Sequence, residues 1–270
     1  MTPVQQTVVL GTKLRLSYVD LGDSRSKEVL VLLPGLSDSW RSWELVLRHL
    51  PTSLRVIAVS QRGHGESDKP DAGYSVRDYA RDLEALLEAL GLARVVVAGH
   101  SSASLVARRF AMEHRERVAG VVLEGSFVRL AGPAVEAAGR RIRDLTDPID
   151  PAFVRDFAAG TFARPVDQTF VEAMIAESLK VPARVWSQTF RSLLDDDDLA
   201  ELATLEAPTL IVWGDQDAIV DRAATDALVR AVRSSRLVQY HGVGHTAHWE
   251  VPEQFARDVA AFVVECGRPR

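Results

Sequence analysis

Runs of almost entirely apolar residues recur along the first half of the chain and predict buried strands. The runs are Val29 to Leu33, Arg55 to Val59, Val95 to Ala98 and Val118 to Leu123. Strands covered by helices on both faces need apolar side chains on both sides. Segments with apolar residues at helical spacing separate the runs, namely Trp40 to Leu50, Val76 to Leu90 and Ser102 to His114. This alternation predicts an α/β fold with a mostly parallel sheet.

A different pattern precedes these runs. Two short β-type segments, Thr7 to Leu10 and Leu14 to Val19, are joined by Gly11, Thr12 and Lys13. A short loop with glycine between two such segments is typical of a hairpin. The sequence therefore predicts an antiparallel edge on the parallel sheet.

The alternation of strand and helix stops between Phe127 and Glu206. This stretch carries helical patterns only, at Phe153 to Ala159, Asp167 to Lys180 and Pro182 to Leu194. The alternation then resumes with strands at Thr209 to Trp213 and Leu237 to Tyr240 and helices near Arg222 to Val232 and Pro252 to Val264. We expect one core domain, residues 1–126 and 207–270, interrupted by a helical cap, residues 127–206.

Four adjacent acids, Asp195 to Asp198, stand near the end of this insertion. A solvated loop that leads into a helix at Leu199 is the expected structure. A cation site is the alternative.

Composition limits the class of protein. Apolar residues make up 47% and charged residues 26% of the 270 residues, a balance typical of a water-soluble globule. The net charge of -5 provides no field that would attract nucleic acid. No apolar run reaches the length of a membrane span, and the first residues do not resemble a secretion signal. Because Cys266 is the only cysteine, we expect a cytoplasmic protein in which Cys266 has a structural role. For the oligomeric state, a homodimer is one alternative.

The candidate nucleophile follows the strand Val95 to Ala98. The sequence there is Gly99-His100-Ser101-Ser102-Ala103, and a helical pattern begins directly afterwards. A serine on a sharp strand-to-helix turn needs small residues two positions before and after it, because the strand and helix pass closely. Gly99 and Ala103 meet this need, although the usual motif, G-x-S-x-G, has a second glycine. A serine that only caps the helix is the alternative to a nucleophile.

A serine hydroxyl needs a base, and the base needs an orienting carboxylate. Gly214-Asp215-Gln216-Asp217 follows one late strand, and Gly242-Val243-Gly244-His245 follows the next. We predict Ser101, His245 and Asp217 as nucleophile, base and acid. Asp217 is preferred to Asp215 because Asp215 lies next to the strand end and is expected to cap the turn.

Five passages in this order resemble the α/β-hydrolase superfamily, in the group that has a helical cap between strands six and seven. They are Leu33 to Leu36, Gln61 to Ser67, Gly99 to Ala103, Gly214 to Asp217, and Gly244-His245 with Glu250 to Glu253. Pro34 and Ser60 depart from the family, which commonly has histidine and aspartate there. The resemblance implies an α/β-hydrolase fold, no cofactor, and an oxyanion hole made by the backbone N–H groups of Leu36 and Ser102.

Other titratable residues near these passages are weighed separately. His241, His245 and His248 are close in sequence, but they lie in a glycine-containing loop, and we expect no metal there. His64 and His100 flank two of the functional turns and are expected to be hydrogen-bonded loop or partly buried residues, with contact to substrate as the alternative. Glu124 ends a strand and is the rival acid; a surface carboxylate is its expected state.

The expected partner is a small molecule with an ester-like bond. Ser101 excludes the family branches that use an aspartate nucleophile, and the aromatic residues of the insertion favour a small to medium hydrophobic carboxylic ester or lactone. We expect Trp186 and Phe190 to contact the substrate, with the cap's own core as their alternative place. A cofactor-free perhydrolase of the haloperoxidase type, a carbon–carbon bond hydrolase, and a small-molecule receptor with slow turnover are the rival functions.

Overall fold

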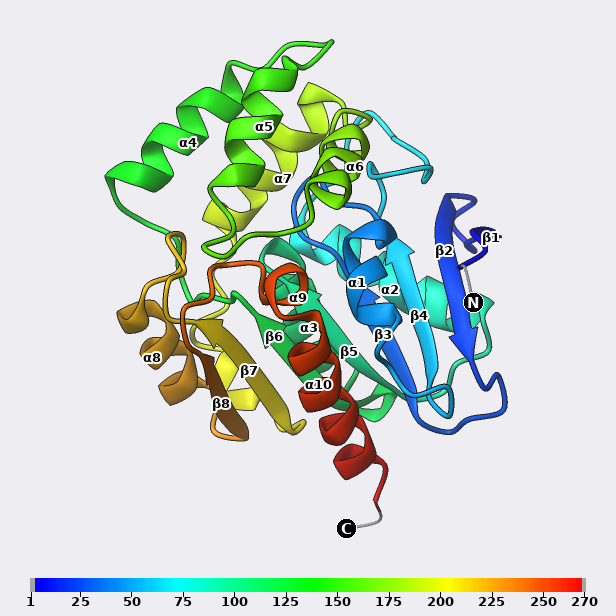
Figure 1. The fold of residues 1–270 in the computed structure, drawn as a ribbon. Coiled ribbons are helices and arrows are strands. Elements are labelled where there is room, and N and C mark those ends of the chain that lie inside the picture. The colour runs from blue at the N-terminus through cyan, green and yellow to red at the C-terminus, as the bar shows by residue number, and fades with distance from the viewer. Residues whose placement is uncertain (1–2, 269–270) are drawn as a thin grey trace.

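The sheet has the mixed topology that the sequence predicts. The computed structural model describes residues 3–268, and within them eight strands form one sheet in the order β1-β2-β4-β3-β5-β6-β7-β8 (Figure 1). The strands are β1 (Gln6–Val9), β2 (Arg15–Gly22), β3 (Val29–Leu33), β4 (Arg55–Ser60), β5 (Val95–His100), β6 (Val118–Glu124), β7 (Thr209–Gly214) and β8 (Ser235–Tyr240). The pairs β1–β2 and β2–β4 are antiparallel, and all the other pairs are parallel.

Helices cover both faces of the sheet. One face carries η1 (Trp40–Trp43), α1 (Glu44–Leu47), α9 (Ala247–Glu250) and α10 (Pro252–Gly267). The other carries α2 (Val76–Ala89), α3 (Ser102–Glu113) and α8 (Arg222–Ala231). The short helix η2 (Arg115–Arg117) leads from α3 into β6. Trp40 to Leu50, predicted as one helix, is η1 followed by the single turn α1.

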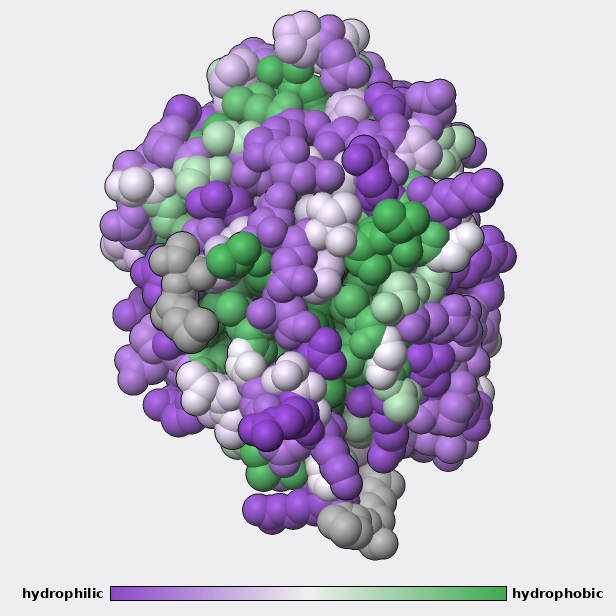
Figure 2. Space-filling model, turned by 90° about the vertical axis from the view of Figure 1, so that its right-hand side faces the viewer, coloured by the Kyte–Doolittle hydropathy of each residue, from purple (hydrophilic) through white to green (hydrophobic). Residues whose placement is uncertain are grey.

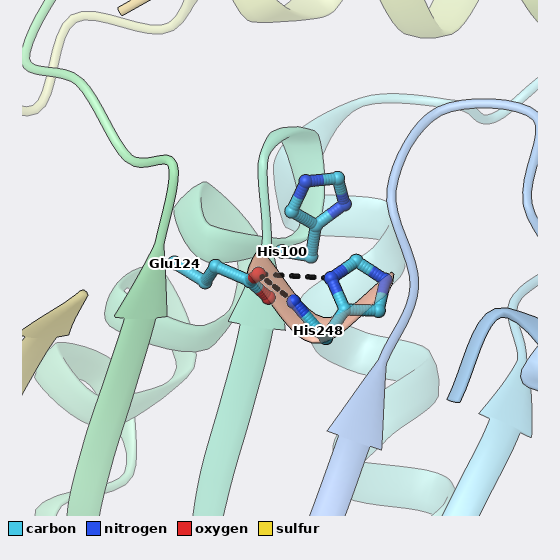
Figure 3. A group of neighbouring side chains, drawn as sticks. All are labelled: His100, Glu124 and His248. Atoms are coloured by element: carbon cyan, nitrogen blue, oxygen red, sulfur yellow. Dashed lines mark hydrogen bonds and ion pairs between the residues drawn. The ribbon is translucent and has the colours of Figure 1, made fainter. Parts of the chain in front are cut away.

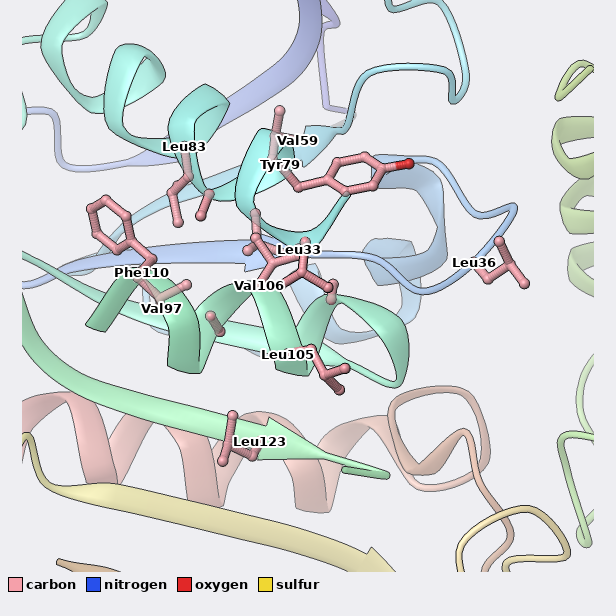
Figure 4. Close-up of a cluster of buried hydrophobic side chains, with 14 of the residues drawn as sticks. Leu33, Leu36, Val59, Tyr79, Leu83, Val97, Leu105, Val106, Phe110 and Leu123 are labelled. Atoms are coloured by element: carbon pink, nitrogen blue, oxygen red, sulfur yellow. The ribbon is translucent and has the colours of Figure 1, made fainter. Parts of the chain in front are cut away.

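Side chains of the central strands alternate between two cores. Leu30 and Leu32 of β3 pack with α1 and α10, whereas Val31 and Leu33 pack with α2 and α3. Figure 4 shows the second of these cores, in which Phe110 of α3 lies among strand and α2 side chains. This alternation explains why the strands read as continuous apolar runs in the sequence.

The surface beside the antiparallel edge is mainly polar. Figure 2 shows this side as largely hydrophilic, with apolar patches interrupted by polar side chains. Val9, on the edge strand β1, is 61% exposed. Within residues 3–268, no helix has the length and apolar character needed to cross a membrane.

The segment between β6 and β7 is helical and lies over the C-terminal ends of the parallel strands (Figure 1). It contains α4 (Pro133–Arg143), α5 (Pro151–Ala159), α6 (Gln168–Ser178), α7 (Ala183–Asp195) and η3 (Leu202–Thr204); we refer to residues 127–206 as the insertion. Tyr79 of α2 and Thr189 of α7 share a buried hydrogen bond of 2.7 Å between their hydroxyl groups. The insertion is thus packed against the helices of the sheet.

The expectation of a solvated loop at Asp195 to Asp198 holds for Asp195 and Asp197, which are exposed, but is wrong for Asp198. Asp198 is fully buried and forms a two-bond ion pair with Arg108 of α3, at 2.7 and 2.8 Å, while Arg108 also donates to the Phe127 carbonyl at 2.6 Å. Asp196 lies 3.5 Å from Arg109. No helix begins at Leu199; residues 199–201 form a turn before η3. Asp198 therefore fastens the end of the insertion to α3, which begins at the candidate nucleophile.

We predict that breaking this pair is costly. Arg108→Ala leaves Asp198 as an uncompensated buried charge, which lowers the free energy of unfolding by about 3–5 kcal/mol. Arg115→Ala is the matched control, because Arg115 forms a surface pair with Glu206 and its loss costs about 1 kcal/mol or less. Urea unfolding of both variants measures the difference, and equal losses would contradict the importance of the buried pair.

Candidate active site

Ser101 occupies a strained turn between β5 and α3. Its backbone has φ 51° and ψ -118°, a conformation that side-chain-bearing residues rarely adopt and that costs about 1–3 kcal/mol. A Cβ atom on Gly99 would lie 2.2 Å from the Ala103 carbonyl oxygen, so only glycine fits at position 99. Ala103 itself is fully buried. The close approach of strand and helix leaves the Ser101 side chain partly exposed at the end of the sheet.

His245 and Asp217 meet on the loops after β8 and β7. The Nδ1 atom of His245 lies 2.7 Å from Oδ2 of Asp217, and both side chains are buried. The other oxygen of Asp217 accepts the backbone N–H groups of Ile219 and Val220 at 2.8 and 2.9 Å. Asp215 instead accepts the N–H of Gly242 at 2.7 Å. The structure thus places Asp217, and not Asp215, against the histidine.

Asp217 contacts only one of the two ring nitrogens of His245. Ser101 and His245 line the same cavity. Nε2 of His245 is buried and has no hydrogen-bond partner among residues 3–268, and the hydroxyl of Ser101 forms no hydrogen bond to it in this state. Hydrogen bonds of this kind often close only when substrate is bound. With Nδ1–H donated to Asp217, Nε2 is left as the acceptor for a hydroxyl proton.

Burial and charge act in opposite directions on His245. Burial lowers the pKa of its imidazole, but the charge and hydrogen bond of Asp217, with smaller contributions from the charges of Glu124 and Asp38, raise the pKa above its ordinary value of 6.5. A base of this kind is neutral only on the alkaline side of that raised pKa.

The backbone of Leu36 and Ser102 flanks the serine. Ser102 is the first residue of α3, so its N–H has no acceptor within the helix. Leu36 lines the cavity, on a loop held by the Gln61 side-chain amide, which donates to the Pro34 carbonyl at 3.1 Å. The next residue, Ser37, has φ 69° and shares a hydrogen bond of 3.1 Å with Ser178 of α6. The loop is therefore fixed both by the sheet side and by the insertion.

A cavity of about 40 Å³ lies beside Ser101, large enough for a few water molecules. Its walls come from the Leu36 loop, the turn at Ser101, the His245 loop and the insertion. The residues that line it are Leu36, Ser37, Asp38, His100, Ser101, Val154, Phe157, Ala158, Thr161, Met174, Ser178, Ile219, His245, Thr246 and Trp249. Lysine and arginine do not occur in this lining.

Trp186 and Phe190 are not part of this lining. Trp186 is fully buried, and its ring packs edge-on against Phe153 and Phe157, with ring centres 5.5 and 5.0 Å apart. Phe190 packs beside Gly139 of α4. Both lie in the interior of the insertion, and Trp186 reaches the cavity only through Phe157, which does line it.

Several wall residues were missed by sequence reasoning. Val154 and Ala158 of α5 line the cavity, as does Trp249; Met174 of α6, which the sequence does place among the pocket candidates of the insertion, lines it too. Trp249 stands only four residues after His245, a spacing that could have marked it. Helical periodicity cannot tell which apolar side of α5 faces the core and which faces substrate.

Glu124 is not a surface carboxylate, as expected from the sequence, but is fully buried. Its Oε1 atom accepts the backbone N–H of His248 at 2.9 Å and lies 2.8 Å from Nδ1 of the same residue. Figure 3 shows this pair with His100 above it. Glu124 is buried because it ends β6 inside the sheet, between β5 and β7, and is in contact with His248 of the following helix α9.

His100, Glu124 and His248 could hold a metal ion, because their ligand atoms lie within 4.8 Å of one another. However, Nδ1 of His248 bonds to Glu124, and Nε2 lies 2.9 Å from the Ser42 hydroxyl. An ion would have to displace one of these bonds. The other histidines lie apart: His241 is exposed, and His64 is buried, with Nδ1 2.8 Å from the Arg62 carbonyl oxygen. We interpret Glu124 and His248 in Figure 3 as a hydrogen-bonded pair that lies beside His100.

The insertion is bonded directly to the His245 loop. The Thr161 carbonyl accepts the backbone N–H groups of His245 and Thr246 at 2.8 and 3.1 Å. Glu250 bridges from the other side: it accepts from the N–H of Gly244 at 2.9 Å and from that of Arg164 at 2.8 Å. His245 is thus positioned partly by the insertion.

Comparison with known proteins assigns the family. A model described as the alpha/beta hydrolase family matches residues 30–258. The chain therefore belongs to the alpha/beta hydrolase family, which confirms the predicted fold class and the expectation of a hydrolase.

Individual relatives differ in their activities. The chain is 30% identical over 269 residues to 2-hydroxy-6-oxononadienedioate/2-hydroxy-6-oxononatrienedioate hydrolase of Burkholderia vietnamiensis, covering 94% of this chain and 92% of the relative. It is 30% identical over 244 residues to a non-heme haloperoxidase of Rhodococcus erythropolis, covering 84% and 88%. The crystal structure of esterase RhEst1 from Rhodococcus sp. ECU1013 superposes with a TM-score of 0.86 at 27% identity, covering 99% of this chain and 100% of that one.

We predict an acidic limb in the pH dependence of hydrolysis. The rate, as kcat/KM, falls as the pH drops through the raised pKa of His245, because the protonated ring cannot accept a proton. Asp217→Asn removes the charge that raises this pKa, so turnover drops by orders of magnitude and the limb of the residual activity moves to lower pH. Asp215→Asn is the matched control, with the parent's rate and limb. An unchanged limb in Asp217→Asn would contradict the pairing.

Proposed function

We propose that the protein is a serine hydrolase that cleaves small to medium, uncharged carboxylic esters or lactones through an acyl-enzyme. The observation that carries the proposal is the strained turn that presents Ser101 to a cavity shared with the His245–Asp217 pair. A helix cap alone would not require the strained backbone at Ser101.

The proposed reaction has two steps. Nε2 of His245 accepts the Ser101 proton while the serine oxygen attacks the carbonyl carbon, and the N–H groups of Leu36 and Ser102 stabilise the oxyanion. The imidazolium, stabilised by Asp217, then donates its proton to the leaving alkoxide. In the second step His245 deprotonates a water molecule that attacks the acyl-enzyme, and collapse of the intermediate releases the acid and restores Ser101.

The cavity supports an uncharged substrate. Its lining contains Asp38 and apolar residues such as Val154, Phe157 and Met174, and neither lysine nor arginine. A carboxylate bound there would be desolvated without a cation. The name of the Burkholderia relative specifies a dicarboxylate, so the lining argues against carbon–carbon hydrolysis of that kind of substrate.

Perhydrolysis is the second candidate, favoured by the similarity to a non-heme haloperoxidase. The same acyl-enzyme would react with hydrogen peroxide in place of water. A small-molecule receptor with slow turnover would differ from a hydrolase and from a perhydrolase, because it would be acylated once without releasing the acyl product.

We predict that a fluorophosphonate probe labels Ser101. Peptide mapping of the labelled protein identifies the site, and Ser104→Ala serves as control, because the Ser104 hydroxyl lies one turn into α3 and bonds to the Ser101 carbonyl and to Ser126. Labelling persists in Ser104→Ala and disappears in Ser101→Ala. Hydrolysis of p-nitrophenyl esters with and without peroxide then separates the two reactions. Labelling at another serine would refute the proposal.

We also predict that Met174, and not Phe190, sets acyl-chain preference. Met174→Ala enlarges the cavity, so the ratio of kcat/KM for octanoate to that for butyrate esters rises about ten-fold or more. Phe190→Ala removes a buried ring away from the cavity, which costs about 3–5 kcal/mol in the free energy of unfolding and leaves the ratio unchanged. The reverse result would indicate that the substrate contacts Phe190 of α7 and not Met174.

A further inference from the structure

A second hydrogen-bonded chain runs beside the proposed triad and ends in the same cavity. It starts at Glu124, whose Oε1 lies 2.8 Å from Nδ1 of His248. Nε2 of His248 lies 2.9 Å from the Ser42 hydroxyl, which lies 3.0 Å from Oδ2 of Asp38. All four side chains are buried, and Asp38 lines the cavity with Ser101. We call Glu124, His248, Ser42 and Asp38 the relay.

Proton counting limits the states of the relay. Its three hydrogen bonds need three protons, but the Ser42 hydroxyl and a neutral His248 ring supply only two. One further proton must therefore be bound for all three bonds to form. It resides on Asp38 or on Glu124, because burial, and then the charge of His245, lower the pKa of His248 well below 6.5.

The hydrogen bonds around Ser42 agree with this count. Its hydroxyl also accepts the indole N–H of Trp249 at 3.0 Å. With the proton on Asp38, the Ser42 oxygen accepts from Asp38 and Trp249 and donates to His248, which fills its capacity. With the proton on Glu124, the bonds of Ser42 to Asp38 and His248 run the other way. Moving the proton shifts one hydrogen along each bond and leaves no charge on Ser42 or His248.

Whether the shared proton is on Asp38 or on Glu124, Asp38 keeps one oxygen that can accept a hydrogen bond. The shared proton, when it is on Asp38, lies on Oδ2 toward Ser42, so the second oxygen, Oδ1, can only accept a hydrogen bond. No group among residues 3–268 donates to Oδ1. A substrate that excludes water from Oδ1 without supplying a donor leaves this acceptor unpaired, at a cost of about 1–3 kcal/mol, and a substrate hydroxyl group avoids that cost.

From this geometry we propose, building on the proposed ester hydrolysis, that Asp38 is a specificity-determining residue that accepts a hydrogen bond from a hydroxyl group of the substrate. The preferred substrate is then a hydroxyl-bearing ester or lactone. The relay places the shared proton on Asp38 or Glu124 and so sets the strength of this acceptor.

The charged groups around Asp38 keep the relay poised near neutral pH. Burial raises the pKa of Asp38 to about 7, the charge of His245 lowers it, and the charges of Glu124 and Glu177 raise it. Glu177 is itself paired with Lys180 at 2.7 Å. Burial also raises the pKa of Glu124 to about 7. As the pH rises through this range the shared proton is lost, Asp38 becomes a charged acceptor, and preference for a hydroxyl donor increases.

The test compares two esters that differ in one hydroxyl group, p-nitrophenyl butyrate and p-nitrophenyl 3-hydroxybutyrate. The parent protein prefers the hydroxy ester by about 10-fold or more in kcat/KM, and the preference grows between pH 6 and pH 8. Asp38→Ala abolishes the preference, and Asp38→Asn, which keeps an acceptor oxygen but cannot ionise, retains part of it without the pH dependence. Asp20→Asn, a remote carboxylate paired with Arg55, is the matched control and behaves as the parent.

Two further measurements distinguish a failure of the proposed ester hydrolysis from a failure of the role proposed for Asp38. If neither ester is hydrolysed, the proposed function fails, and binding of 3-hydroxybutanamide against butanamide, measured by calorimetry, still tests Asp38. Ser42→Ala interrupts the relay but leaves Asp38 in place, so the hydroxyl preference persists and its pH dependence shifts. A parent protein without hydroxyl preference in turnover or binding, or an equal preference in Asp38→Ala, would overturn the proposal.

Discussion

The turn at Ser101 is the constraint on which the site depends. Its positive φ is sustained because β5 and α3 are held on both sides: Gly99 lets the helix approach, and the Ser101 N–H donates to the Glu124 carbonyl of the neighbouring strand at 2.8 Å. The buried Arg108–Asp198 pair holds α3 farther along. Relaxing the turn to an ordinary backbone would move the hydroxyl away from the cavity and misalign the Ser102 N–H.

Two buried carboxylates near each other hold two histidines in different ways. Asp217 pairs with His245, and Glu124 pairs with His248, while the ring of His100 lies between the two imidazoles, with ring centres 4.9 and 4.6 Å away. Burial, the dominant influence, lowers the pKa of His100 well below its ordinary value, so this ring does not add a charge. The uncharged ring of His100 therefore separates the Asp217–His245 pair from the Glu124–His248 pair.

The sequence predicted features with a local signal. Strands buried on both faces are apolar throughout, and the helix starts at Val76 and Ser102 are correct, because periodicity and caps are encoded within a few residues. The pairing of Asp217 with His245 was also predicted, since both follow adjacent strands and the ends of parallel strands meet. That Asp217, His245 and Ser101 act together in catalysis stays a prediction.

What the sequence could not give depends on partners far along the chain. Asp198 reads as solvent-exposed among other acids, because its partner, Arg108, is 90 residues away. Glu124 reads as a surface residue, since nothing near it in sequence announces His248. The sequence around Asp38 does not indicate its role, which depends on a hydrogen bond to Ser42, one turn away. Ser42 in turn contacts His248, more than 200 residues later.

The bonds from Thr161 and Glu250 to the His245 loop bear on how this architecture could diversify. Exchanging the insertion for that of a relative would also remove the Thr161 carbonyl, which accepts from the backbone of His245 and Thr246, and the N–H groups of Ala163 and Arg164, which donate to Glu250. A chimera would therefore need residues 161–164 transplanted or retained together with the loop 244–250. Substitutions in residues 161–164 and in the loop 244–250 are therefore expected to be coupled in evolution.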